Sequence, residues 1–285
     1  MGDSKPAAKL ALGVVTFNND AAQLAHLLRS VELAAREAAA RAAVSLYVID
    51  NGAETVWPAS PAHGVALRRL APVGNVGFGH AMNLLMAAAF ADEAAGWFLC
   101  VNPDGVLHRR CLGELLLASG AAPGALVEAR QFPEEHRKAY DAATMETPWA
   151  SGACLLIPRV LYEAVGGFDP NFFMYLEDID LSWRARAAGF KVLVAPGALF
   201  GHSVMGRAAS PAVERFTLTS GRYLAFKWKG ERFREWVEGL LVGRGLFASR
   251  AELPALPETG AGRFDTFDTS VADFEHGFDF APVRW

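Results

Sequence analysis

Three carboxylates fall within four consecutive positions of this sequence: Glu177, Asp178 and Asp180. The apolar and aromatic run FFMYL, residues 172–176, precedes them. Burial beside such residues raises the pKa of a carboxyl group, which suits a general base. A structural role is also open, because the helix dipole stabilises acidic side chains in the first turn of a helix.

Polar residues also follow three apolar runs of strand length, at 10–16, 44–49 and 97–101. The polar side chains in question are Asn18, Asp50 and Asp104. Helix-like segments alternate with these runs, which predicts a parallel sheet covered by helices on both faces. Ligands of such sheets bind beyond the carboxyl ends of the strands, so these residues predict where a site lies. The full pattern predicts helices at 21–43, 83–95, 176–188, 213–229 and 232–246, and further strands at 65–70, 125–132, 152–157 and 191–195.

Two loops could each contact part of a nucleotide. Asp50 can accept the imide N–H of uracil or thymine, although the Asp-Asn-Gly sequence that it begins is also ordinary turn chemistry. The run GNVGFG at 74–79 can bring backbone N–H groups close to a diphosphate at the start of a helix. It is not a P-loop, because no Gly-Lys-Ser/Thr follows it.

Three further side chains each have a structural and a functional interpretation. Trp149 and Tyr175 could stack on sugar rings or pack in the core. His202 could be a hydrogen-bonded loop histidine, or its neutral imidazole could ligate a metal or stabilise a diphosphate.

Taken in order, these segments resemble the family-2 glycosyltransferases, and within them the rhamnosyltransferase-like branch. The resemblance covers residues 10 to about 205. It rests on VVTFN at 14–18, VIDNG at 48–52, NVGFG at 75–79 with Asn83, VNPD at 101–104, SGA at 151–153, VGGFD at 165–169, FFMY at 172–175, EDIDL at 177–181, and His202.

This resemblance implies an α/β protein of the GT-A fold, in which helices flank a mixed, mostly parallel sheet. The catalytic domain would span 1–205, with a donor half to about 105 and an acceptor half from about 106. C-terminal helices at 206–250 and an acidic, aromatic tail at 251–285 would follow. The implied reaction moves a sugar, with rhamnose as the best guess, from a dTDP- or UDP-sugar with inversion. Its acceptor would be a saccharide, a glycoconjugate or a lipid-linked sugar.

The resemblance also implies roles for single residues. Asp178 would be the general base, and Asp104 and His202 would hold a divalent metal, Mn²⁺ or Mg²⁺. Donor contacts are implied for Thr16, Asn18, Asp50, Asn75, Gly77, Asn83 and Asn102, and acceptor contacts for Trp149, Tyr175 and Glu177. The sequence departs from many GT-A enzymes at Asn102, where they carry an aspartate.

Two other functions share parts of this pattern. A nucleotidyltransferase needs a basic, glycine-rich loop near the N-terminus, and TFNNDAAQ at 16–23 contains no Gly, Lys or Arg. A catalytically silent saccharide-binding or scaffold subunit of the same fold stays open, because Asn102 and the tail are compatible with it. The presence of Asp104, Asp178 and His202 favours the enzyme.

Composition disfavours several broad classes of protein. The 285 residues are 52% hydrophobic and carry a net charge of −4, which disfavours disorder and general nucleic-acid binding. No window of about 18 uncharged apolar residues predicts a membrane-spanning helix. Cys100, Cys111 and Cys154 lack metal-ligand spacing, which predicts reduced thiols in a cytoplasmic protein.

The basic, aromatic stretch 222–250 is either a solvated face, a surface covered by the tail, or a contact with the inner face of a membrane. The tail itself predicts docking within the chain or, in a homo-oligomer, between subunits.

Overall fold

The computed structural model describes residues 8–52, 55–58, 64–202, 210–257 and 267–276. In this part of the chain eight strands form one mixed sheet in the order β3-β2-β1-β4-β7-β6-β8-β5. The strands are β1 (Lys9–Thr16), β2 (Ala43–Asp50), β3 (Ala66–Arg69), β4 (Ala95–Val101), β5 (Val106–Leu107), β6 (Leu126–Pro133), β7 (Cys154–Pro158) and β8 (Val192–His202). The helices are α1 (Ala21–Ala38), α2 (Phe78–Phe90), α3 (Cys111–Ala121), α4 (Arg159–Val165), α5 (Glu177–Ala187), α6 (Pro211–Lys227) and α7 (Glu231–Gly243), with 3₁₀ turns at Arg250–Glu252 and Thr269–Val271.

The first half of the sheet is parallel, as predicted. β1 pairs in parallel with β2 and β4, and β2 pairs in parallel with β3. Thr16 lies opposite Asp50 in this register, so the ends of β1 and β2 meet at one edge. β7 runs antiparallel to β4 and to β6, and β6 is parallel to β8. The sheet is therefore mixed, with more parallel than antiparallel pairs.

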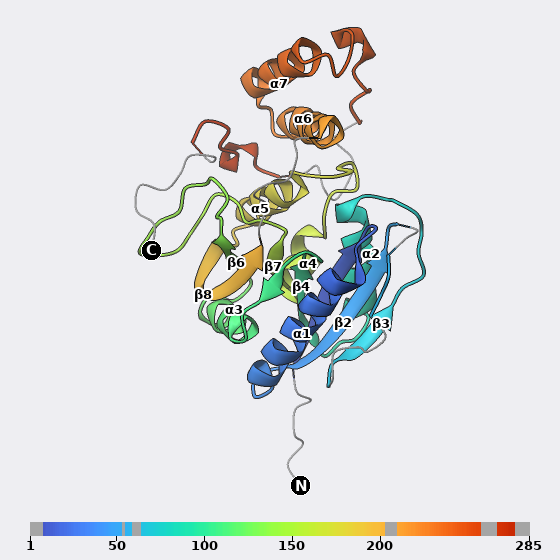
Figure 1. The fold of residues 1–285 in the computed structure, drawn as a ribbon. Helices are drawn as coiled ribbons and strands as arrows, with labels where there is room; N and C mark the ends of the chain where they lie inside the picture. The colour runs from blue at the N-terminus through green and yellow to red at the C-terminus, as the bar shows by residue number, and fades with distance from the viewer. Residues whose placement is uncertain (1–7, 53–54, 59–63, 203–209, 258–266, 277–285) are drawn as a thin grey trace.

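Helices cover both faces of the sheet (Figure 1). Leu27 and Val31 of α1 and Leu115 of α3 pack on one face with alternate residues of β1. Met82 of α2 and Leu181 of α5 belong to the apolar core on the opposite face. This two-sided burial explains why the strands are almost continuously apolar in sequence.

Local sequence explains several helix boundaries. The side chain of Asp20 accepts a hydrogen bond from Gln23 N at 2.7 Å and caps α1. α2 begins at Phe78, five residues earlier than the sequence pattern indicated, because Gly77 with φ 83° turns the chain into it. The pattern did not predict α3 and α4.

The C-terminal helix α6 packs against α5 through a separate aromatic core. This core contains Trp183 of α5 and Tyr223 and Trp228 at the end of α6. Part of the predicted tail completes it: Phe267 stacks on Trp228 with ring centroids 4.2 Å apart, and Phe274 meets the Trp183 ring at 5.0 Å. The tail thus docks within the chain over 267–276, whereas 258–266 and 277–285 lie outside the described residues.

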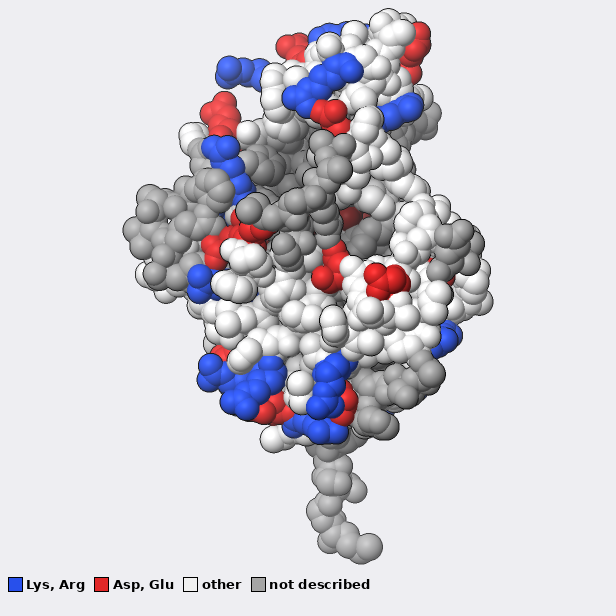
Figure 2. Space-filling view, in the orientation of Figure 1, with Lys and Arg blue, Asp and Glu red and all other residues white. Residues whose placement is uncertain are grey.

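The placement of charged side chains, the apolarity of the helices and the state of the cysteines bear on three further expectations from the sequence. Figure 2 shows Lys and Arg side chains at the lower edge of this face and over the C-terminal helices, separated by mostly uncharged and acidic surface. Among the described residues, no helix combines the length and apolarity needed to cross a membrane. All three cysteines lie in described segments, where they are buried and free.

Candidate active site

A pocket of about 400 Å³ opens where the ends of the strands meet the start of α5. It gathers six of the sequence-predicted residues: Asn102, Trp149, Tyr175, Glu177, Asp178 and His202. Met174 of the FFMY motif lines it as well, and so do His136 and Thr217, which the sequence pattern did not single out. Segments far apart in the chain therefore converge on one cavity.

Asp178 lies in the first turn of α5 and in the wall of this pocket. Gly152 N donates to Asp178 Oδ2 at 2.8 Å, and Ile179 N donates to Oδ1 at 2.9 Å. Burial raises the pKa of the Asp178 carboxyl, although these two donors and His136 oppose the shift. A carboxylate held in place with a raised pKa has the properties of a general base.

The backbone immediately before α5 is strained. Tyr175 and Leu176 have φ of 71° and 66°, a left-handed conformation that non-glycine residues rarely adopt. Such conformations cost about 1–3 kcal/mol each and cluster at functional sites. Here the two successive residues turn the chain so that α5 begins with Glu177 and Asp178 at the pocket.

Glu177 is buried beside two other carboxylates, Asp178 and Asp180. Within the described residues its Oε2 has no hydrogen-bond partner. Burial, followed by the charges of Asp178 and Asp180, holds the pKa of Glu177 well above its usual range. A protonated Glu177 would be a hydrogen-bond donor rather than a second base.

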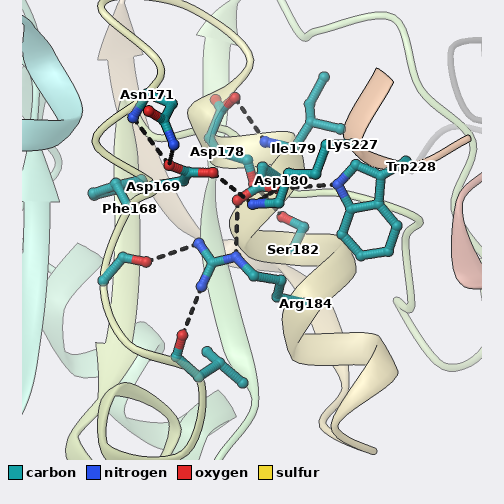
Figure 3. Close-up of polar contacts among 12 residues, drawn as sticks. Phe168, Asp169, Asn171, Asp178, Ile179, Asp180, Ser182, Arg184, Lys227 and Trp228 are labelled. Atoms are coloured by element: carbon teal, nitrogen blue, oxygen red, sulfur yellow. Dashed lines mark hydrogen bonds and ion pairs between the residues drawn. The ribbon is translucent and has the colours of Figure 1, made fainter. Parts of the chain in front are cut away.

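Asp180, the third carboxylate, belongs to a buried ion network and not to the pocket (Figure 3). Arg184 Nε donates to its Oδ2 at 2.8 Å, and Lys227 Nζ lies 2.7 Å from its Oδ1. Lys227 also pairs with Asp169 at 2.7 Å. Burial alone would raise the pKa of Asp180, but Arg184 and Lys227 outweigh it and lower that pKa. This network joins α6 to the start of α5.

Asp104 and His202 lie together at the end of β8. His202 Nε2 is 3.3 Å from Asp104 Oδ1 and, within the described part of the chain, has no hydrogen-bond partner. Burial lowers the pKa of His202, while Glu134 opposes the shift, so the imidazole is neutral near neutral pH. One carboxylate oxygen and one imidazole nitrogen form a donor pair that suits Mn²⁺. Over the described ranges no cluster of three such ligands occurs, so bound substrate or water would complete the coordination.

The predicted nucleotide-side residues lie at the joined ends of β1 and β2. Thr16 Oγ1, Thr55 Oγ1 and Gly52 N all donate to Asp50 Oδ1, at 2.9, 2.8 and 3.1 Å. Thr16 is fully buried, so it acts through Asp50. A Cβ on Gly52 would lie 2.4 Å from Asn18 Oδ1, which places Asn18 directly beside this turn.

The glycine-rich loop serves packing more than the sequence pattern indicated. Gly77 N donates to Asn75 Oδ1 at 3.2 Å, and Phe78 N donates to Phe173 O at 3.1 Å. These two N–H groups are therefore occupied within the protein. Asn83 donates to Phe168 O at 2.7 Å and accepts from Phe168 N at 2.8 Å. The polar groups of Gly77 and Asn83 thus help to hold the two halves of the site together, and their contacts with the donor stay a prediction.

Trp149 borders the pocket but is largely enclosed. It is 6% exposed, with Lys138 Nζ 4.8 Å and the His136 ring 5.7 Å from its ring centroid. Tyr175 is less buried and lines the same pocket. Both structural and ligand-contacting roles are therefore compatible with Trp149, whereas Tyr175 presents surface to the cavity.

Several polar residues behind the pocket were missed from sequence. Glu128 and Gln131 are buried on β6, and Lys138 is buried in the loop that follows. The available signal was the presence of Glu128 and Gln131 inside an otherwise apolar run. His136 gave no comparable signal, because it lies in a segment of mostly charged residues.

Comparisons with known proteins agree with this geometry. The family model described as glycosyltransferase like family 2 matches residues 121–229, a range that includes α5 and α6. An N-acetylglucosaminyl-diphospho-decaprenol L-rhamnosyltransferase from Mycobacterium tuberculosis is 30% identical, and the match covers 63% of this chain and 73% of that protein.

Solved structures share the fold. A mannosyltransferase from Pyrobaculum calidifontis, in complex with GDP-Man and Mn²⁺, is similar with a TM-score of 0.58 at 16% identity, over 82% of this chain and 69% of that one. GalNAc-T7 with UDP, GalNAc and Mn²⁺ is similar with a TM-score of 0.56 at 13% identity, over 85% of this chain and 51% of that one. These similarities confirm the predicted GT-A fold. Together with the 30% identical relative, they show that the chain belongs to the rhamnosyltransferase branch of the family-2 glycosyltransferases and is a glycosyltransferase.

Proposed function

We propose that this glycosyltransferase moves a sugar, with inversion, from a dTDP- or UDP-sugar to a lipid-linked saccharide, and that rhamnose is the sugar transferred. The Mycobacterium tuberculosis relative, named as a rhamnosyltransferase acting on a diphospho-decaprenol sugar, supports the choice of donor sugar and acceptor. The observation that carries the proposal is the pocket itself, in which the partly buried Asp178 and His202, the neighbour of Asp104, line one cavity.

Asp178 would take the proton from the acceptor hydroxyl. As that proton moves to the carboxylate, the hydroxyl oxygen forms a bond to the anomeric carbon and the bond to the diphosphate breaks on the opposite face. The hydrogen bonds from Gly152 N and Ile179 N fix the orientation of the carboxylate. Its raised pKa makes it a stronger base than an exposed aspartate. Glu177 would contact the acceptor as a hydrogen-bond donor.

Asp104 and His202 would hold a divalent metal, and their oxygen and nitrogen ligands favour Mn²⁺ over Mg²⁺. When bound, such a cation neutralises charge on the departing nucleoside diphosphate. Asn102 lines the same pocket and would contact the donor with an uncharged amide.

Asp50 would accept the imide N–H of the pyrimidine base, because Thr16, Thr55 and Gly52 already fix its Oδ1 and so orient the carboxylate. Asn18 would lie beside the ribose and Asn75 nearer the sugar. On the acceptor side, Tyr175 and the edge of Trp149 would contact saccharide rings. A lipid-linked acceptor would bring the enzyme to a membrane surface, and we assign the inner face.

Replacing Asp178 by Asn tests this proposal. The substitution keeps the size of the side chain and removes the base, so kcat with dTDP-rhamnose and a lipid-diphosphate-linked N-acetylglucosamine should fall about 10²–10⁴-fold. The affinity for dTDP and UDP, measured by thermal shift in the presence of Mn²⁺, should be unchanged. Asp20→Asn is the matched control, since Asn also caps helices well and Asp20 lies at the start of α1. Full activity of D178N would refute the base assignment. A wild-type protein that binds saccharide but transfers no sugar would favour the silent scaffold.

A further inference from the structure

A continuous chain of buried polar side chains runs behind the pocket to His202. Lys138 forms an ion pair with Glu128, whose Oε2 also accepts from Ser151 N at 2.9 Å. Gln131 Nε2 lies 3.2 Å from Glu128 Oε1, and Gln131 Oε1 lies 3.0 Å from His202 Nδ1. The four residues that form this series (Lys138, Glu128, Gln131 and His202) are each at most 5% exposed.

The charges in this series of side chains determine which atom of each group donates and which accepts. Glu128 is ion-paired with Lys138 and is therefore an acceptor only. The amide of Gln131 must turn its NH₂ group toward Glu128, which leaves its carbonyl oxygen toward His202. A carbonyl oxygen can only accept, so His202 Nδ1 carries the hydrogen of the neutral ring. The Phe200 ring stacks on the imidazole with centroids 5.6 Å apart and restricts its rotation.

This tautomer has a direct consequence for the opposite side of the ring. With the hydrogen on Nδ1, Nε2 presents a lone pair toward Asp104 Oδ1, 3.3 Å away. Two acceptors that face each other repel, and a cation that lies between them converts the repulsion into attraction to both. In known metal sites a ligating histidine donates its other N–H to a neighbouring acceptor, which fixes the tautomer.

We infer that Gln131, oriented by the Glu128–Lys138 pair, is a positioning residue that holds His202 in the Nδ1–H tautomer and so prepares Nε2 to bind a divalent cation. The inference rests on the metal-binding role proposed above for Asp104 and His202. It assigns a function to three residues on β6 and its following loop that do not contact the cation themselves.

The tautomer can be measured without any metal. In the metal-free full chain labelled with ¹⁵N-histidine, long-range ¹H–¹⁵N spectra distinguish a protonated from an unprotonated ring nitrogen. The His202 signals are identified by their loss in His202→Gln. We expect Nδ1 protonated and Nε2 unprotonated in the wild type. Gln131→Met keeps the length of the side chain but removes the acceptor, so the ring should shift toward the Nε2–H form.

The same variant should weaken cation binding. Mn²⁺ alone, titrated and followed by electron paramagnetic resonance of the free ion, should bind Gln131→Met about 10- to 100-fold less tightly than the wild type. Ser119→Ala is the control, because it removes another buried side-chain hydrogen bond, 3.0 Å from Trp97 Nε1 at the start of β4. It should change neither the His202 tautomer nor the Mn²⁺ affinity.

A second variant keeps the test decisive if Gln131→Met does not fold. The double variant Glu128→Gln/Lys138→Met removes the ion pair as a unit and leaves Gln131 free to turn, so both tautomers of His202 should appear. A wild-type His202 protonated on Nε2, or an unchanged tautomer in both folded variants, would overturn the inference. A wild type with the expected tautomer that binds no Mn²⁺ would instead refute the proposed metal site, which separates the two failures.

Discussion

Replacing Lys227 with methionine should destabilise the protein by about 3–5 kcal/mol, the usual cost of removing one partner from a buried ion pair. Lys227 Nζ lies 2.7 Å from both Asp169 Oδ2 and Asp180 Oδ1, and all three side chains are essentially inaccessible to water. Methionine fills a similar volume, so the loss is mainly electrostatic. Because domains are stable by only about 5–15 kcal/mol, this variant would lose a large part of its stability.

Removal of Lys227 leaves one of the two carboxylates with less charge compensation than the other. Asp180 keeps Arg184 at 2.8 Å and Trp228 Nε1 at 2.9 Å. Among the described residues, the donors that remain to Asp169 are uncharged, namely Tyr223 OH at 2.8 Å and two groups of Asn171, each at 2.9 Å. Adding Asp169→Asn to Lys227→Met should therefore restore about 2–3 kcal/mol, at the upper end of measured coupling energies.

Urea unfolding followed by far-ultraviolet circular dichroism measures these free energies. The pKa of Asp180 is lowered in the folded protein, so its ion pairs contribute stability above the unfolded value of about 3.9, and this contribution is lost as the pH falls through the lower folded value. The difference in free energy of unfolding between the wild type and Lys227→Met should thus become smaller at acidic pH. A cost below about 1 kcal/mol at neutral pH, or no recovery in the double variant, would refute the reasoning.

Two further predictions concern the residues around the pocket. Glu177→Gln should raise the melting temperature near neutral pH, because burial first, then Asp178 and Asp180, raise the pKa of Glu177 above its value in the unfolded chain. The gain should vanish as the pH falls below that unfolded value of about 4.3, where Glu177 is protonated in both states, and a lower melting temperature at neutral pH would contradict the prediction. Gly77→Ala should cost at least about 1–3 kcal/mol, since φ is 83° and the added Cβ would lie 2.0 Å from Phe173 O. Its control is Gly96→Ala, whose Cβ would meet no described atom within 4 Å, and equal urea midpoints for the two variants would refute the argument.

Much of the parallel half of the sheet could be predicted from the sequence, because its strands are uniformly apolar and end in polar residues. α3 was missed because its segment, CLGELLLASGA, is almost wholly apolar and shows little helical periodicity. α4 was missed because it has only seven residues. The start of α2 lies five residues before the predicted position, because Gly77 imposes a turn that composition does not reveal. The bounds of α5, in contrast, were predicted to within one residue.

The candidate site was predictable where chemistry is concentrated in the sequence, as at 177–180, and not where it depends on distant partners. The three carboxylates look alike in sequence. They differ because Asp178 accepts from the backbone, Glu177 is enclosed, and Asp180 meets Lys227 from α6. The pairing of Gln131 with His202 likewise depends on the alignment of β6 with β8, which no local pattern encodes.

The Lys227 network also constrains the order in which the molecule can be completed during synthesis. The chain emerges from its N-terminus, so Asp169 and Asp180 are available before the ammonium that neutralises them. Until α6 has emerged, burying these two carboxylates beside the apolar core is unfavourable. The turn that carries Asp178 into the pocket therefore gains its final support late, and a nascent chain ending before Lys227 lacks the charge balance of the finished site.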